Sequence, residues 1–178
     1  HIREGKGSAD TAIRAIIDSA QNMERIVHDV LDFTKPIRFE LKEEDMRSIL
    51  NRSCNSCKVK AEEEGVTLSV DIPAKPVNIA IDSFQMQRAL INLIDNAIKY
   101  SPKETAITVL LKEEKNSITL QVKDAGKGIA DEEKKKVFDK FYRTGNAATK
   151  GAKGTGLGLY LTKKIIQNHN GEITVTNN

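Results

Sequence analysis

Three polar side chains are predicted to share one face of a helix over residues 88–100. At about 100° per residue, Asn92, Asn96 and Lys99 fall within roughly 60° of one another. The opposite side is apolar, as a helix packed on a core requires, with Met86, Leu90, Leu93, Ile94 and Ala97. Two asparagines are poor helix formers, so a function is one explanation for their presence. Amides beside an ammonium group suit a hydrated metal ion and its phosphates, although a solvated polar stripe explains the pattern equally well.

A first glycine segment, Asp-Ala-Gly-Lys-Gly-Ile at residues 124–129, follows a run typical of a strand. A carboxylate at a strand end can point into a cleft and accept a hydrogen bond from an exocyclic amine, which is the chemistry we predict for Asp124. Gly126 and Gly128 allow tight turns and the close approach of a base. The alternative is that Asp124 only initiates a turn.

A second glycine segment, Gly-Thr-Gly-Leu-Gly-Leu at residues 154–159, directly precedes a predicted helix. Amides at a helix N-terminus, without Cβ atoms in the way, form a phosphate site. A dinucleotide-binding interpretation fails because a small, flexible loop precedes the segment instead of a strand. The chain has no GxxxxGK[ST] run, which argues against a P-loop enzyme. Residues 144–153 are predicted to form a lid or a surface loop.

Taken together, the order and spacing of these motifs resemble the ATP-binding domain of sensor histidine kinases, in the GHKL group with gyrase, Hsp90 and MutL ATPases. The resemblance covers roughly residues 82–176 and extends in part to residue 9. It implies ATP and Mg²⁺ as cofactors, with Asn96 on the metal and Asp124 reading adenine. It also implies a wider set of nucleotide contacts, weakest for the pair at 140 and 143: Asn92, Lys99, Tyr100, Gly126, Gly128, Ile129, Lys140, Arg143, Gly154, Thr155, Gly156, Leu157, Gly158 and Leu159.

Position 92 favours a kinase over an ATPase. The resemblance includes the hydrolytic members of the GHKL group. In these ATPases, a glutamate one helical turn before the metal-binding asparagine activates water. This chain has Asn92 there, and an amide is not a useful base at neutral pH. We therefore predict that the chain transfers a phosphoryl group to a histidine, and that the catalytic residues are Asn92, Asn96 and Lys99. The alternatives are a GHKL ATPase or an inactive nucleotide-binding interaction module.

An N-terminal helix is predicted from a heptad pattern over residues 9–34, ended by Pro36. It resembles the second helix of the histidine kinase dimerisation hairpin, which implies a homodimer and relay to a response regulator. The first helix, with the phosphoacceptor, is expected to be missing. His1, His28 and His169 all lack the acceptor's sequence context, so we interpret them as structural or solvated.

The whole pattern predicts an α/β (α+β) two-layer sandwich of the Bergerat/GHKL type, with a mixed sheet covered on one face by about three helices. Residues 1–35 form the long coiled-coil-type helix, 36–44 a linker and 45–178 the ATP-binding catalytic domain, with a last strand that looks truncated. Predicted helices span 45–64, 83–100 and 156–169, and a short charged helix is predicted at the start of the range 131–143. Predicted strands span 66–72, 77–81, 105–112, 117–123 and 172–176.

Composition limits the function classes. The 178 residues are 39% hydrophobic with a net charge of +3, which supports a globular core and gives no case for nucleic acid. No apolar run approaches the roughly 20 residues of a membrane span. We expect a cytoplasmic fragment, with any membrane anchor of the intact protein upstream. Cys54 and Cys57 are predicted to be small core residues, because no second ligand pair for zinc is present.

Overall fold

The computed structural model describes residues 12–13, 16–17, 19–20, 23–24, 27, 39–115, 117–144 and 154–177. The described residues before 28 are helical, as the heptad pattern predicts, and their large apolar side chains are between 49% and 67% exposed: Ile13, Ile16, Ile17, Met23 and Val27. The predicted ends of this helix, His1 and His28 lie outside the described residues. No helix within the described ranges is both long and apolar enough to cross a membrane.

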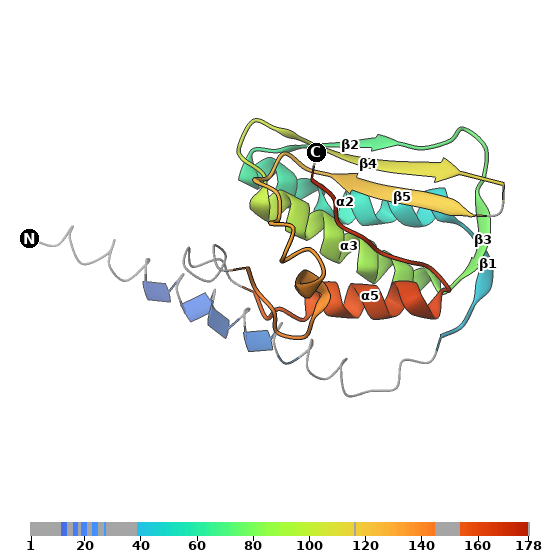
Figure 1. The fold of residues 1–178 in the computed structure, drawn as a ribbon. Coiled ribbons are helices and arrows are strands. Elements are labelled where there is room, and N and C mark those ends of the chain that lie inside the picture. The colour runs from blue at the N-terminus through green and yellow to red at the C-terminus, as the bar shows by residue number, and fades with distance from the viewer. Residues whose placement is uncertain are drawn as a thin grey trace, which may run out of the picture.

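The sheet is mixed, as predicted. Strand β4 (Ala106–Glu113) lies in the middle, with β2 (Thr67–Asp71) parallel on one side and β5 (Ile118–Lys123) antiparallel on the other. A separate antiparallel pair joins β1 (Lys42–Asp45) to β3 (Asn78–Ile81). Figure 1 shows this pair at the end of the domain where the chain enters it.

Three helices form the second layer of the sandwich. They are α2 (Met46–Glu64), α3 (Ser83–Tyr100) and α5 (Gly158–Asn168), and they lie on the same side of the three-stranded sheet (Figure 1). A short 3₁₀ turn, η1 (Lys136–Phe138), precedes α5. The predicted two-layer architecture is therefore confirmed.

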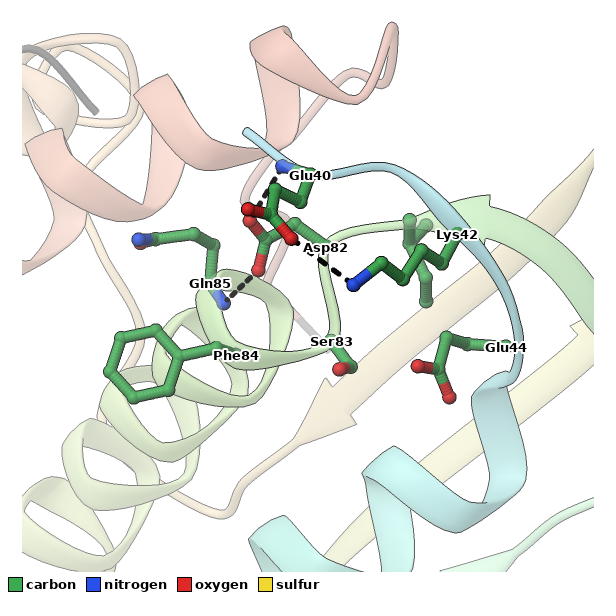
Figure 2. A pocket seen from close by; sticks show the side chains of 8 residues that line it. Glu40, Lys42, Glu44, Asp82, Ser83, Phe84 and Gln85 are labelled. Atoms are coloured by element: carbon green, nitrogen blue, oxygen red, sulfur yellow. Dashed lines mark hydrogen bonds and ion pairs between the residues drawn. The ribbon is translucent and has the colours of Figure 1, made fainter. Parts of the chain in front are cut away.

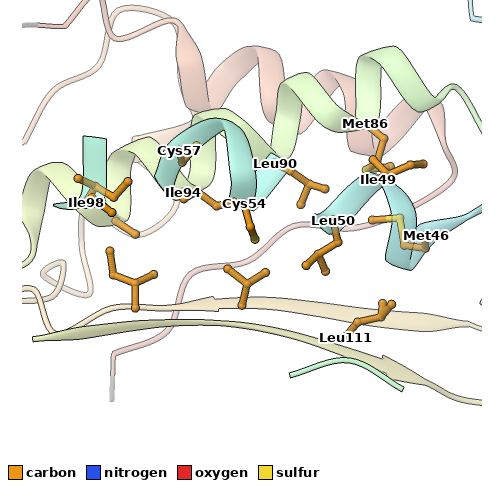
Figure 3. Close-up of a cluster of buried hydrophobic side chains, with 14 of the residues drawn as sticks. Met46, Ile49, Leu50, Cys54, Cys57, Met86, Leu90, Ile94, Ile98 and Leu111 are labelled. Atoms are coloured by element: carbon orange, nitrogen blue, oxygen red, sulfur yellow. The ribbon is translucent and has the colours of Figure 1, made fainter. Parts of the chain in front are cut away.

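The hydrophobic core lies between α2, α3 and β4, and Figure 3 shows its side chains meeting there. Aliphatic residues build it because the chain has no Trp and few other aromatic residues. Cys54 and Cys57 are 5% and 2% exposed and belong to this core, as predicted. The central members are Met46, Ile49, Leu50, Ile81, Leu90, Ile94, Ile98, Ile107, Val109 and Leu111.

Local signals set the helix ends. Asp45 caps α2 by accepting a hydrogen bond from Arg47 N–H, and Gly65 ends α2 in the left-handed conformation with φ 71°. Asp82 caps α3 by accepting from Gln85 N–H at 3.0 Å. The reciprocal half of a capping box is missing, because Gln85 Oε1 is buried without a partner among the described residues.

Three element predictions were wrong. Residues 42–44 of the predicted linker belong to β1, which pairs with β3. The short charged helix predicted within 131–143 is a series of turns followed by η1, because only Val137 and Phe138 are buried in this charged stretch. The predicted last strand over 172–176 is irregular, and the segment is held by the side chain of Asn177 rather than by a backbone ladder.

A polar junction joins the point of chain entry to α3 and α5. Asp82 N–H donates to His169 Nε2 at 2.9 Å, so the other ring nitrogen carries the proton and donates to Ile165 O at 2.7 Å. Asp82 Oδ2 accepts from Glu40 N–H at 3.1 Å, and Phe39 packs edge-on against the imidazole. His169 is thus structural, which is one of the two roles expected for it.

An open pocket of about 360 Å³ lies beside this junction (Figure 2). Its walls come from the segment that contains β1 and from the first turn of α3, including Glu40, Lys42, Asp82 and Phe84. None of the residues predicted to bind nucleotide lines it.

Candidate functional site

One end of the second glycine segment lies against the polar stripe of α3 at Asn92. Asn92 Nδ2 donates to Thr162 Oγ1 on α5 at 2.9 Å, and Thr162 is 1% exposed. A Cβ atom on Gly158 would overlap Asn92 Oδ1. Glycine at 158 is therefore required for α5 to begin this close to α3.

The other end of the same segment lies against Lys99, two turns further along α3. A Cβ atom on Gly154 would lie 3.4 Å from Lys99 Nζ, and this ammonium group lies 5.0 Å from the centre of the Tyr100 ring. The glycine segment therefore runs antiparallel to α3, from Lys99 to Asn92. Asn96, which is half-buried, lies between these two points on the predicted face.

The first glycine segment lies at the C-terminal end of α3. Gly126 N–H donates to Asp124 Oδ1 at 2.8 Å, so the turn-forming role of this aspartate is confirmed. A Cβ atom on Gly126 would lie 2.7 Å from Asp124 Oδ1 and 3.1 Å from Tyr100 O. The structure thus brings both glycine segments to one stretch of α3, between Asn92 and Tyr100.

The N-terminus of α5 lies beside Asn92, where Gly158 begins the helix. Its N-cap residue is Leu157, and no side-chain cap serves the first turn in the described part of the chain. Leu157 N–H donates to Thr155 Oγ1 at 3.2 Å, while the Leu157 side chain is 1% exposed and belongs to the interior. A ligand contact of Leu157 stays a prediction, and because the side chain is buried the backbone would have to make it.

Gly156 fixes the turn before α5. Its φ of 73° and the close approach of the Phe141 backbone, with Cα 2.8 Å from an added Cβ, both require glycine. Phe141 N–H donates to Gly156 O at 3.0 Å. This bond ties the glycine segment to the chain that follows η1.

The two weakest predicted contacts, Lys140 and Arg143, lie in the chain that follows η1. Lys140 Nζ lies 5.2 Å from the centre of the Tyr160 ring, and Arg143 is exposed, so their part in the site stays a prediction. Leu159 is half-buried in the first turn of α5. Sequence reasoning missed Asn177, which holds the backbone of Ile129 from a distant part of the chain.

The donor set fits a metal ion carried on phosphates better than a metal ion held by protein alone. Across the described ranges, no group of three or more His, Cys, Asp or Glu side chains could hold a metal. An amide such as Asn96 supplies a single neutral oxygen, which suits Mg²⁺ that keeps water and phosphate oxygens as its other ligands. Gly154 lies beside the ammonium group of Lys99, whose positive charge suits those phosphates.

Residues 81–178 match the family of histidine kinase-, DNA gyrase B- and HSP90-like ATPases. The chain belongs to this family. Among curated proteins, sensor protein SrrB of Staphylococcus aureus (strain N315) is 30% identical over 168 residues. That alignment covers 92% of this chain and 29% of SrrB, so the chain spans less than a third of this relative.

Several solved structures have a similar fold. Mycobacterial sensor histidine kinase MprB is 28% identical with a TM-score of 0.66, over 77% of this chain and 85% of that one. Full-length ShkA in complex with AMPPNP is 21% identical with a TM-score of 0.80, over 95% and 36%. Histidine kinase ThkA in complex with response regulator TrrA is 22% identical with a TM-score of 0.77, over 94% and 47%.

Proposed function

We propose that this chain is the catalytic portion of a sensor histidine kinase. It binds ATP with Mg²⁺ and transfers the γ-phosphate to a histidine on a dimerisation hairpin, for relay to a response regulator in the cytoplasm. The observation that carries this proposal is the antiparallel contact of residues 154–158 with the stripe of α3, with Gly158 against Asn92 and Gly154 beside Lys99. The AMPPNP complex of ShkA supports the nucleotide, and the ThkA–TrrA complex supports the relay.

Each polar residue of the site has a distinct task in this proposal. Asp124 accepts a hydrogen bond from the exocyclic amine of adenine, and the backbone donors in the first turn of α5 hold phosphate oxygens. Lys99 lies at the Gly154 end, where its charge offsets that of the phosphates. Asn96 supplies the oxygen that would hold Mg²⁺, which when bound neutralises negative charge on the transferring phosphoryl group.

Asn92 favours transfer over hydrolysis. Its Nδ2 donates to the buried Thr162 hydroxyl, which orients the amide toward Gly158 instead of toward bulk water. A neutral amide takes no proton from water at neutral pH, so a water molecule at this position has no base. Transfer of the γ-phosphate to the acceptor histidine is therefore favoured over its hydrolysis by water.

The N-terminal helix supports the partner part of the proposal. Ile13, Ile16 and Val27 are between 53% and 67% exposed, although they follow the predicted heptad seam. Leaving such a seam in water is unfavourable, and a helix of this kind needs a partner. In the proposed assembly it packs in the dimerisation bundle against a second copy.

The test is an assay with γ-labelled ATP and Mg²⁺, with and without an added dimerisation hairpin that contains the acceptor histidine. We expect acid-labile label on the hairpin and little free phosphate. Asn96→Ala should abolish transfer, whereas Asn55→Ala, an exposed asparagine on α2, should not change it. Free phosphate without labelled protein would favour an ATPase, and binding with neither product would favour an inactive module. Label on this chain alone would mean that His1 or His28 is an acceptor.

A further inference from the structure

The side-chain amide of Asn177 forms a two-point clamp on the backbone of Ile129. Asn177 Oδ1 accepts from Ile129 N–H at 2.9 Å, and Asn177 Nδ2 donates to Ile129 O at 2.9 Å. The two residues are 48 positions apart, and the amide satisfies both backbone groups of one residue as a neighbouring strand would.

The clamp requires the glycine that precedes its target. A Cβ atom on Gly128 would lie 2.8 Å from Asn177 Oδ1, and Gly128 has φ 73°. Both facts exclude an ordinary side chain at 128. The second glycine of the Asp124–Ile129 loop therefore makes room for the Asn177 amide, a role distinct from contact with a ligand.

Three contacts hold the Asp124–Ile129 loop. Its start is fixed by the Gly126 N–H bond to Asp124 Oδ1, its middle lies against Tyr100 O at the end of α3, and its end is held by Asn177. Loop residues bind a ligand more tightly when their conformation is already set before binding. Of these constraints, the Asn177 clamp is the only one of the three supplied from beyond α5.

We propose that Asn177 is a positioning residue that holds the Asp124–Ile129 loop in the shape that receives a purine base whose exocyclic amine is at C6. The inference rests on the proposed function, since that function supplies adenine as the base. Asn177 acts through Ile129 and the loop. It sets how well the carboxylate of Asp124 is aimed, and so affects affinity and base selectivity rather than the transfer step.

The experiment compares the full chain with Asn177→Ala and Asn177→Asp, and uses Asn55→Ala as a control amide on the exposed face of α2. Binding of ATP and of GTP is measured by calorimetry, KM and kcat by transfer to the hairpin, and exchange of the Ile129 amide proton by NMR. We expect Asn177→Ala to weaken ATP binding about tenfold, which is the effect of about one or two net hydrogen bonds. The ATP-to-GTP preference should fall, KM should rise and kcat should stay within about twofold.

Hydrogen exchange without ligand measures the effect of Asn177 on the loop separately from its effect on nucleotide binding. Without ligand, the Ile129 N–H should exchange faster in Asn177→Ala than in the wild type. Asn177→Asp keeps an acceptor for this N–H, so the amide proton should remain partly protected from exchange in that variant. Because Asn177 is exposed, the melting temperature should barely change. Unchanged ATP affinity and unchanged Ile129 exchange in Asn177→Ala would overturn the inference while leaving the proposed function intact. A wild-type chain that binds no ATP would instead overturn the proposed function.

Discussion

Removing Asp45 is expected to destabilise the domain at neutral pH much more than at acid pH. The carboxylate caps α2 by accepting from Arg47 N–H and also accepts from Val77 N–H, both at 3.1 Å. Its Oδ2 lies 2.9 Å from a guanidinium nitrogen of Arg47, and each side chain is 22% exposed. Asp45 therefore links the start of α2 to the turn before β3.

The magnitude follows from these contacts. Loss of a helix N-cap costs about 1 kcal/mol, and leaving the Val77 N–H without its acceptor costs about 1 kcal/mol more. The ion pair adds little, since partly exposed pairs contribute between about 0 and 1 kcal/mol. We expect Asp45→Ala to lower the free energy of unfolding by about 2 to 3 kcal/mol at pH 7.

The pH dependence has a definite sign. The hydrogen bond from Arg47 is the largest cause that lowers the pKa of Asp45 from 3.8 to about 2. A carboxylate whose pKa is lowered by folding stabilises the folded state fully above pH 3.8, and this contribution is lost as the pH falls through about 2. Asp45→Asn keeps the cap but loses the charge, so it isolates this pH-dependent part.

The assay is urea unfolding followed by circular dichroism at pH 7, 5 and 3 for the wild type and both variants. The difference in unfolding free energy between wild type and Asp45→Asn should be largest at pH 7 and 5 and should narrow at pH 3. A difference that stays constant over this range would refute the linkage argument. Equal stability of wild type and Asp45→Ala at pH 7 would refute the capping argument.

Further predictions concern the core thiols and the end of α2. Burial raises the pKa of Cys54 to about 11 and is the largest cause that raises the pKa of Cys57 to about 12. Both thiols should therefore fail to react with a disulfide reagent at pH 8 until denaturant is added; rapid reaction in the native state would contradict their burial. Gly65→Ala should cost about 1 kcal/mol in urea unfolding, because φ is 71° while the nearest atom to an added Cβ lies at 3.7 Å, on Lys103. No loss of stability would show that the left-handed cap contributes nothing there.

The sequence predicts well those features that depend on neighbouring residues. The end of α2 at residue 64, the start of α3 at residue 83 and the apolar face of α3 are local patterns, and the structure confirms each one. The meeting of Gly154 with Lys99 and of Gly158 with Asn92 is not local. The resemblance to a known family implied only that these residues contact one nucleotide, and it did not specify these contacts.

The features that the sequence did not predict depend on distant partners. Strand β1 has the charged sequence Lys-Glu-Glu-Asp, which no strand pattern identifies, and it forms because β3 offers an edge. The Asn177 clamp joins a side chain to a backbone 48 residues away, so no spacing rule reveals it. A helix was predicted before η1 from a charged sequence, and the sequence alone does not show that few side chains there are buried.

The junction of Asp82 with His169 has a consequence for the order in which the domain folds. The two residues are 87 positions apart, so during synthesis the Asp82 N–H meets this acceptor only after α5 has left the ribosome. The Glu40 N–H, by contrast, can meet Asp82 as soon as α3 begins. Contacts between distant residues slow folding because a long loop must close first. Docking of α5 should therefore be a late step, and until then the growing chain has the stripe of α3 without the glycine segment that completes the site.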